Sequence, residues 1–192
     1  MFPNIREDWA TYERDIWRQG LWAMLVYRYG CWRYRVRWTA LRWPLSLLYR
    51  FLKVGSQILT GIDLPCETRV GRRLLIEHFG GIIISGDTVI GNDVVIRQGV
   101  TLGLRRRGQP GAPIIGDRVD IGAGAKILGP VRIGDDAVIG ANAVVLEDVP
   151  AGATAVGIPA RIKPPRAVRS GGEAPAGPGA GHAAAIPDRV AA

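Results

Sequence analysis

The stretch LLIEHFGG, residues 74–81, holds one of only two histidines in a chain of 192 residues, set between an apolar run and a glycine pair. An imidazole can both accept and donate a proton during a reaction, so the residue type of His78 suits acid–base chemistry. A histidine in such a turn also serves simply to cap the backbone, so both interpretations stand at this point. The other histidine, His182, lies in a low-complexity segment and is given no role.

Few other residues have types and spacings that indicate chemistry. Cys31 and Cys66 are too few for a disulfide framework and lack the paired spacing of a zinc site, so we interpret both as packing residues in a reducing compartment. The glycine-rich stretch at 122–129 lacks the Lys-Ser/Thr of a phosphate-binding loop. Neither a secretory signal nor an apolar run of about 20 residues is found, so we expect a cytoplasmic location.

The net charge of +8 is concentrated in one segment. Residues 16–62 contain no Asp or Glu but eight Lys or Arg, and every Trp lies within the first 43 residues. Arginine mixed with tryptophan is typical of a segment that lies on an anionic membrane, here through residues 16–60. A helical subdomain packed by its aromatic residues explains the same composition, so both interpretations stand. Nucleic acid is not expected as a partner, because no recognition motif is present.

The elements that must position His78 change character near residue 61. Before it, apolar residues recur at helical spacing, with breaks expected at Gly20 and Gly30 and a fresh helix start at Pro44. After it, the period is six: between 115 and 149 two β-branched or small residues recur in every six without a slip. A short strand plus a turn, three to a coil, produces this period. We therefore predict a mainly β protein, a β-helix preceded by a short α-helical segment.

Glycines follow the inward-facing residues of this repeat, and we expect them to supply turn conformations that strain other residues. They are Gly116, Gly122, Gly134 and Gly140.

Two places break the register, and irregular places in a repeat fold often carry function. The step from Ile76 to Ile84 is eight residues and includes His78. The step from Leu102 to Ile115 is thirteen, so residues 104–113 must leave the coil as a loop. The predicted organisation is a helical segment at 1–60, a β-helix domain at 61–162 and a disordered tail, rich in Ala, Gly and Pro, at 163–192.

Five motifs resemble the serine acetyltransferases of the hexapeptide-repeat acyltransferases. They are GIDLP at 61–65, EHFGG at 77–81, IRQGVTLG at 96–103, DIGAGAKILG at 120–129 and VGIPARI at 156–162. The resemblance implies a left-handed parallel β-helix that assembles as a homotrimer and transfers acetyl from acetyl-CoA to a hydroxyl group. It also implies that His78 removes the hydroxyl proton, and that Asp63, fifteen residues earlier, holds the other ring nitrogen.

For acetyl-CoA, a co-substrate rather than a bound cofactor, the resemblance implies an extended site along the coils between neighbouring subunits. Backbone N–H groups beside Gly103 are the expected donors to the oxyanion. Ala123 and Ala141 match positions of close contact with the pantetheine arm, and Lys126 and Arg161 are candidates to bind the CoA phosphates. No metal is expected, because a zinc site on such a solenoid requires several histidines.

The acceptor side departs from the family pattern. The family carries Asp-Arg-His-Pro-Lys at the end of the loop, where the arginine pairs with the substrate carboxylate, and this chain reads PGAPI at 110–114. Glu77 replaces the family's aspartate beside the histidine. Arg105 and Arg106, followed by Arg107, are the remaining candidates for acceptor binding.

Three functions are therefore kept open. The resemblance favours L-serine as the acceptor, in cysteine biosynthesis, whereas the altered loop favours a sugar or polysaccharide precursor; a non-catalytic trimeric scaffold is the third. Because the loop lacks the clamp, serine turnover is expected to be weak in kcat/KM. Gly111→Arg with Ala112→His is then expected to raise it.

Overall fold

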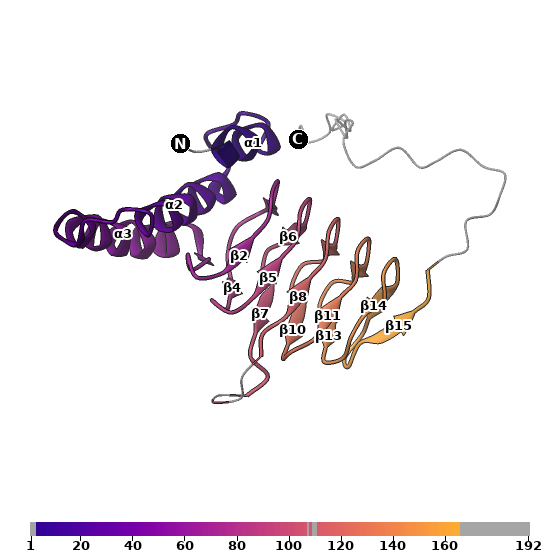
Figure 1. The fold of residues 1–192 in the computed structure, drawn as a ribbon. Coiled ribbons are helices and arrows are strands. Elements are labelled where there is room, and N and C mark those ends of the chain that lie inside the picture. The colour runs from indigo at the N-terminus through magenta and orange to yellow at the C-terminus, as the bar shows by residue number, and fades with distance from the viewer. Residues whose placement is uncertain (1–2, 107, 109–110, 166–192) are drawn as a thin grey trace, which may run out of the picture.

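The protein is described here from a computed structural model, which covers residues 3–106, 108 and 111–165. Three helices come first: α1 (Pro3–Thr11), α2 (Gln19–Arg33) and α3 (Thr39–Thr60). Short strands follow and wind into a three-sided prism (Figure 1). Arg107 and most of the tail predicted at 163–192 lie outside the described residues. Lys163, placed in the tail by sequence, ends the last strand instead.

Each coil of the prism gives one short strand to each face in turn. The first sheet contains β1 (Ile62–Asp63), β4 (Ile82–Ile84), β7 (Thr101–Gly103), β10 (Lys126–Leu128) and β13 (Val144–Val145). The second contains β2 (Arg69–Val70), β5 (Val89–Ile90), β8 (Ile114–Ile115) and β11 (Arg132–Ile133). The third contains β3 (Leu75–Glu77), β6 (Val95–Arg97), β9 (Asp120–Ile121), β12 (Val138–Ile139), β14 (Thr154–Val156) and β15 (Arg161–Lys163). Neighbours are parallel except β15, which runs antiparallel to β14.

The six-residue period reflects the way side chains pack inside the prism. Ile115, Ile121 and Ile127 lie one per face around a single coil and are at most 2% exposed. The small residues of the repeat, such as Ala125 and Ala137, fill the corners and are fully buried. One bulky and one small side chain in each six therefore complete the core, and the predicted parallel β-helix after a helical segment is confirmed.

The repeat glycines have a different role from the predicted one. None of Gly116, Gly122, Gly134 and Gly140 has a positive φ. A Cβ built on Gly122 would lie 2.6 Å from the backbone nitrogen of Ala141 in the next coil, so close approach between coils is what requires glycine. The left-handed turn positions are instead held by residues such as Asp136 and Asn142, since Asn and Asp tolerate this conformation.

The helices cover the open end of the prism, where backbone groups of the first coil would otherwise lack partners. Tyr27 lies over β2: its hydroxyl donates to the Thr68 carbonyl at 2.8 Å and accepts from the Val70 N–H at 3.2 Å. The hydroxyl of Tyr12 accepts from the Ile76 N–H at 3.0 Å. Burial raises the pKa of both phenols, so they stay neutral hydrogen-bonding groups.

Two predicted helix boundaries are wrong. Gly30 lies inside α2 rather than at a break, because the Tyr49 ring and Cys66 pack where its side chain would be. Pro44 lies inside α3 rather than at its start. The helix begins earlier because the N–H groups of Leu41 and Arg42 already bond to the Trp38 carbonyl.

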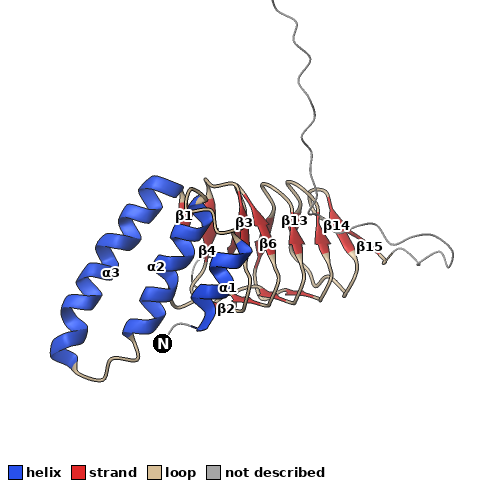
Figure 2. Cartoon of the chain, turned by 90° about the horizontal axis from the view of Figure 1, so that it is seen from above, coloured by secondary structure: helices blue, strands red, loops and turns tan. Residues whose placement is uncertain are grey.

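The helices form layers over the prism end. Figure 2 shows α2 between α3 and the strands, with α3 outermost. Cys66 is buried between them and Cys31 is half-buried, and both are free thiols. Within the described ranges no helix is long and apolar enough to cross a membrane.

Candidate active site

His78 lies in the irregular turn that follows β3. Ile62 pairs with Ile82, twenty positions on, whereas Ile83 pairs with Thr101, only eighteen on, so the first coil is two residues longer than the next. The extra length bulges at the turn, where His78 has a φ of 61° and its side chain is exposed. Such a conformation is uncommon for a residue with a side chain and often marks a functional site.

The same prism edge carries the residues expected to contact the co-substrate. The Gly99 N–H donates to Gly80, the Gly124 N–H to Gln98, and the Asn142 N–H to Ala123. The turns at 78–81, 98–100, 122–125 and 140–143 therefore stack into one column, called here the His78 edge. Ala123 and Ala141 lie on it, which agrees with their expected place beside an extended ligand.

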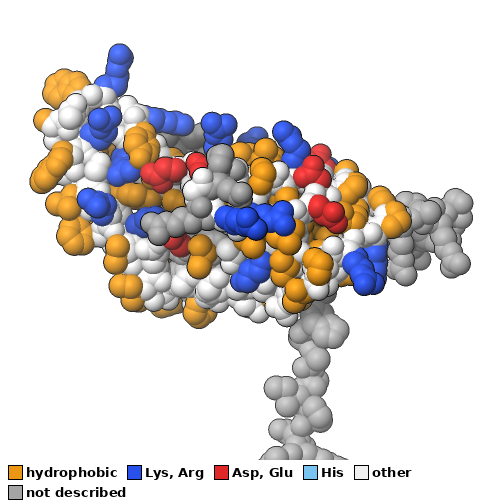
Figure 3. Space-filling view, turned by 90° about the horizontal axis from the view of Figure 1, so that it is seen from below, with side chains coloured by type: hydrophobic (Ala, Val, Ile, Leu, Met, Phe, Trp, Pro, Cys, Tyr) orange, Lys and Arg blue, Asp and Glu red, His pale blue; other side chains and the backbone are white. Residues whose placement is uncertain are grey.

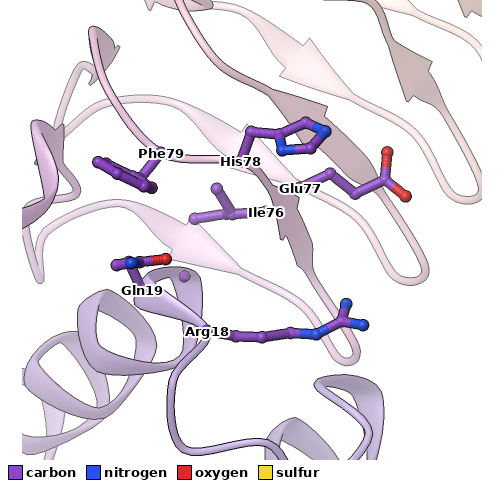
Figure 4. Close-up of a pocket in the computed structure, with 7 residues that line it drawn as sticks. Arg18, Gln19, Ile76, Glu77, His78 and Phe79 are labelled. Carbon is purple, nitrogen blue, oxygen red and sulfur yellow. The ribbon is translucent and has the colours of Figure 1, made fainter. Parts of the chain in front are cut away.

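A pocket of about 360 Å³ lies between this turn and the start of α2. Its lining residues are Arg18, Gln19, Gly20, Ile76, Glu77, His78 and Phe79. Gly20 makes it possible, because a Cβ there would lie 2.8 Å from the Ile76 carbonyl oxygen and push α2 away. Figure 4 shows the side chains of Arg18, Glu77 and His78 extending to the same side of the pocket.

Both charged groups of the pocket have partners, although both remain partly exposed. The Glu77 carboxylate lies 2.9 Å from the Arg97 Nε, and Arg97 also bonds to Asp120 on the next strand. The Arg18 guanidinium contacts Glu13 at 2.5 Å and keeps 38% of its side-chain surface exposed. The pocket therefore presents a cation, an anion and an imidazole within one small volume.

Asp63 shares this end of the molecule with His78 but is not bonded to it. Of the hydrogen bonds among the described residues, none joins the two side chains. Asp63 Oδ1 instead lies 3.3 Å from the Lys53 Nζ of α3. Catalytic hydrogen bonds often form only in the substrate complex. The predicted Asp63–His78 pair stays a prediction.

The loop arginines lie on another edge of the prism. Arg105 and Arg106 are exposed and follow β7, at the corner between the first and second sheets. His78 lies at the corner between the third and first sheets. One chain therefore brings Glu77 to His78 but leaves Arg105 and Arg106 apart from them.

The remaining predicted residues lie along the strands. Gly103 ends β7, and its carbonyl accepts the Gly129 N–H of the next coil at 2.9 Å. The Lys126 ammonium donates to the Gly99 carbonyl and to Thr101 Oγ1, so it bridges two coils. Arg161 is exposed in β15, just beyond the last turns of the His78 edge.

The exchange predicted to restore a carboxylate clamp in the loop is contradicted by local geometry. Gly111 has a φ of 110°, and a Cβ there would lie 2.6 Å from the Pro130 side chain. Ala112 is only 7% exposed. Arg at 111 and His at 112 would therefore distort the loop rather than line the site.

Arg18 is the site residue that sequence reasoning missed. It stood among eight basic residues of the segment 16–62 without any local motif to single it out. Only the docking of α2 on β3 brings it to His78, and the small residue Gly20 beside it is the one sequence signal of that close approach. No group of three or more potential metal-ligating side chains is found in the part of the chain that the structure describes.

The stacked six-residue coils and their irregular histidine turn define the class of protein. Residues 112–147 match the family model of the bacterial transferase hexapeptide, six repeats. The molecule is a hexapeptide-repeat transferase.

The particular family follows from whole-chain comparisons. The chain is 43% identical to the serine acetyltransferase of Helicobacter pylori strain J99 over 83% of its own length and 88% of the relative's. A Brucella abortus serine acetyltransferase solved with Coenzyme A superposes with a TM-score of 0.72 at 30% identity, over 83% and 66% of the two chains. Soybean serine acetyltransferase complexed with serine gives 0.69 at 35%, over 84% and 70%. Some other curated relatives are matched over about half their length. The chain belongs to the serine acetyltransferase family, a family of acyltransferases.

Proposed function

We propose that this protein transfers acetyl from acetyl-CoA to the hydroxyl of L-serine, and that His78 is the general base. The observation that carries the proposal is the pocket itself, which gathers an imidazole, a carboxylate and a guanidinium from His78, Glu77 and Arg18. Relatives that bind Coenzyme A and serine support the choice of both substrates.

The chemistry assigned to His78 is a proton relay. A hydroxyl is a poor nucleophile at neutral pH, so a base within hydrogen-bond reach of its proton accelerates attack by about 10²- to 10⁴-fold. His78 takes that proton as the serine oxygen bonds to the thioester carbonyl carbon. When the tetrahedral intermediate collapses, the C–S bond breaks and the imidazolium returns the proton to the CoA thiolate. Asp63 orients the ring in the substrate complex.

The acceptor is recognised as a zwitterion. Free serine carries a carboxylate and an ammonium beside its hydroxyl, and Arg18 and Glu77 offer one opposite charge to each. A hydrogen bond to a charged group contributes about 1.5 to 3 kcal/mol, which corresponds to roughly 10- to 100-fold in affinity. Arg18 thus supplies from α2 the guanidinium that the loop at 110–114 lacks, and this replaces the expectation of weak serine turnover.

The co-substrate is assigned to the His78 edge. Its small residues Ala123 and Ala141 leave room for the pantetheine arm, and Arg161 lies near the far end of the edge for the phosphates. Lys126 is already bonded to the coil backbone, so its contribution to phosphate binding requires that it exchange partners. Backbone N–H groups beside Gly103, which ends β7 on the edge that bears Arg105 and Arg106, are the assigned oxyanion donors from a neighbouring subunit.

The active unit is proposed to be a homotrimer. Within one chain the loop that bears Arg105 and Arg106 leaves a different edge from the one that bears His78. A groove between two subunits brings unlike edges together, so these arginines complete the site of a neighbouring subunit. This arrangement also encloses an extended acetyl-CoA between subunits, in a cytoplasmic enzyme.

One observation favours a second acceptor class. The loop end at 111–113 carries no charged side chain, because Gly111, Ala112 and Pro113 pack against the coil, with Gly111 beside Pro130. A loop without a charged group at this end suits a larger, uncharged hydroxyl donor such as a glycosyl unit.

Steady-state kinetics of an Arg18 variant separate the two acceptors. Arg18→Ala is expected to raise the KM for L-serine by roughly 10- to 100-fold and to leave the KM for acetyl-CoA unchanged, because only the carboxylate contact is lost. Arg6→Ala, which removes an exposed arginine outside the pocket, is the matched control. An unchanged KM for serine, together with faster acetylation of sugars, would assign the site to the second acceptor class.

A further inference from the structure

The outer face of α3 is apolar, and the residues that pack against the protein lie on the opposite face. Tyr49 and Thr60 are buried against the rest of the molecule, and Lys53 turns inward to pair with Asp63. The exposed face carries ten large apolar side chains, each at least 40% exposed. These are Leu41, Trp43, Leu47, Leu48, Phe51, Leu52, Val54, Ile58 and Leu59, with Trp38 at the N-cap.

This face is too large and too uniform for ordinary surface. Trp43, Phe51 and Ile58 lie about two turns apart along this face and are each 70% exposed or more. A soluble monomer rarely exposes a continuous apolar patch of this kind unless something covers it. No strand of the prism covers this apolar face, because α3 is the outermost layer of the molecule (Figure 2).

Basic side chains border the apolar face. Arg35 and Arg37 precede α3, and Arg50 lies on its flank; all three are exposed and have no carboxylate partner among the described residues. Figure 3 shows hydrophobic and basic side chains together at the helical end of the molecule, on the left. Acidic residues are absent from the whole segment 16–62.

The charge decides between the two obvious occupants. A symmetric contact with a second copy through this face would bring the arginines of both copies together, and the segment offers no carboxylate to offset their repulsion. An anionic bilayer offers negative headgroups to the arginines and an apolar interior to the side chains between them. Trp38 and Trp43 also suit the boundary between headgroups and acyl chains.

We infer that α3 lies in the plane of an anionic phospholipid surface, with its apolar face inserted and Arg35, Arg37 and Arg50 on the headgroups. The helix binds from one side and does not span the bilayer, which agrees with the charged residues Arg42, Arg50 and Lys53 within it. This binding holds the prism and its pocket at the membrane surface. It does not depend on the proposed acetyl transfer.

Vesicle co-sedimentation of the full chain tests the inference. Vesicles of equal parts phosphatidylglycerol and phosphatidylcholine are expected to bind the protein at low salt, and pure phosphatidylcholine much less. Arg37→Gln with Arg50→Gln should weaken binding by roughly 25-fold, about five-fold for each charge removed. Phe51→Ser with Ile58→Ser should weaken it at every salt concentration, since salt screens only the charged contribution.

The matched control is Arg132→Gln with Val138→Ser, which removes one exposed cation and one exposed apolar side chain from the prism and should leave binding unchanged. Thermal unfolding of each variant checks that it folds. Equal binding to neutral and anionic vesicles, or none to either, would overturn the inference. Concentration-dependent association of the protein that Phe51→Ser with Ile58→Ser abolishes would also overturn it, because it would assign the face to a second copy.

Discussion

The prism and the helical segment solve the burial of apolar surface in opposite ways. In the prism the apolar residues of each six-residue repeat point inward and are almost completely buried, as Ile121 and Ile127 are. In α3 the apolar residues point outward, and Trp43 and Ile58 are mostly exposed. The prism therefore buries its apolar residues within one chain, whereas the helical segment leaves a continuous apolar face exposed.

The candidate site lies where these two regions meet. The prism contributes Glu77 and His78 from a coil that departs from its regular length, and α2 contributes Arg18. A repeat interior leaves little freedom for new chemistry, because a change in one coil displaces the coils above and below it. The ends of a solenoid, where helices dock, tolerate such departures.

The largest expected effect comes from removing the base at this junction. His78→Ala should lower the kcat for acetyl transfer by about 10²- to 10⁴-fold, because the hydroxyl proton then has no acceptor. Its melting temperature should stay close to that of the unchanged protein, since the side chain is exposed. Thiol release from acetyl-CoA measures the rate, and near-normal turnover in the purified variant would remove His78 from the role of base.

A single methyl group between coils tests the closed packing of the prism. Gly122→Ala places its Cβ 2.6 Å from the Ala141 nitrogen and should cost about 3 kcal/mol, the upper end of the usual cost of overpacking. Gly55→Ala in α3 is the control, because nothing lies within 4 Å of its Cβ and alanine favours a helix. In denaturant unfolding, the free energy of unfolding should fall for Gly122→Ala and rise for Gly55→Ala. Similar shifts in the two variants would contradict the proposed difference in packing between prism and helical segment.

Hydrogen bonds of tyrosine hydroxyls stabilise the contact between the helices and the prism. Tyr27→Phe should lower the free energy of unfolding by about 1 to 2 kcal/mol, because the Thr68 carbonyl and the Val70 N–H lose their partner in a buried place. Tyr34 is 53% exposed and its hydroxyl bonds only to the side chains of Arg33 and Glu67, so Tyr34→Phe should have a smaller effect. Equal losses of unfolding free energy in the two variants would mean that the Tyr27 hydrogen bonds do not stabilise the contact between helices and prism.

The smallest expected effect is the acid sensitivity of the pairs that join coils on the prism surface. A hydrogen bond from the Arg73 guanidinium holds the pKa of Asp93 below its ordinary value. A carboxyl group with a lowered pKa stabilises the fold when ionised, and this contribution is lost as the pH falls through that pKa. Asp93→Asn should therefore lower the melting temperature slightly at neutral pH, and the difference should vanish in acid. A difference independent of pH would contradict the assignment.

The prism could be predicted from sequence because the pattern that forms it repeats within short stretches of the chain. The period of six and the two breaks in it are visible in residues 62–149, and each coil repeats the same contacts. The helical segment could not be predicted so well, since its glycines and its proline respond to partners far along the chain. Gly30 is fixed by Tyr49 and Cys66, and Gly20 by the carbonyl of Ile76. Arg18 reaches the pocket only through that last contact, and no local pattern contains it.

The most direct test of the central claim is the selectivity of the unchanged protein between L-serine and L-serine methyl ester, in which a neutral ester replaces the carboxylate. With acetyl-CoA saturating, we expect kcat/KM to favour L-serine by roughly 10- to 100-fold, and Arg18→Ala to remove that preference. Equal kcat/KM values for the two acceptors in the unchanged protein, with a sugar hydroxyl acetylated faster than either, would contradict the account.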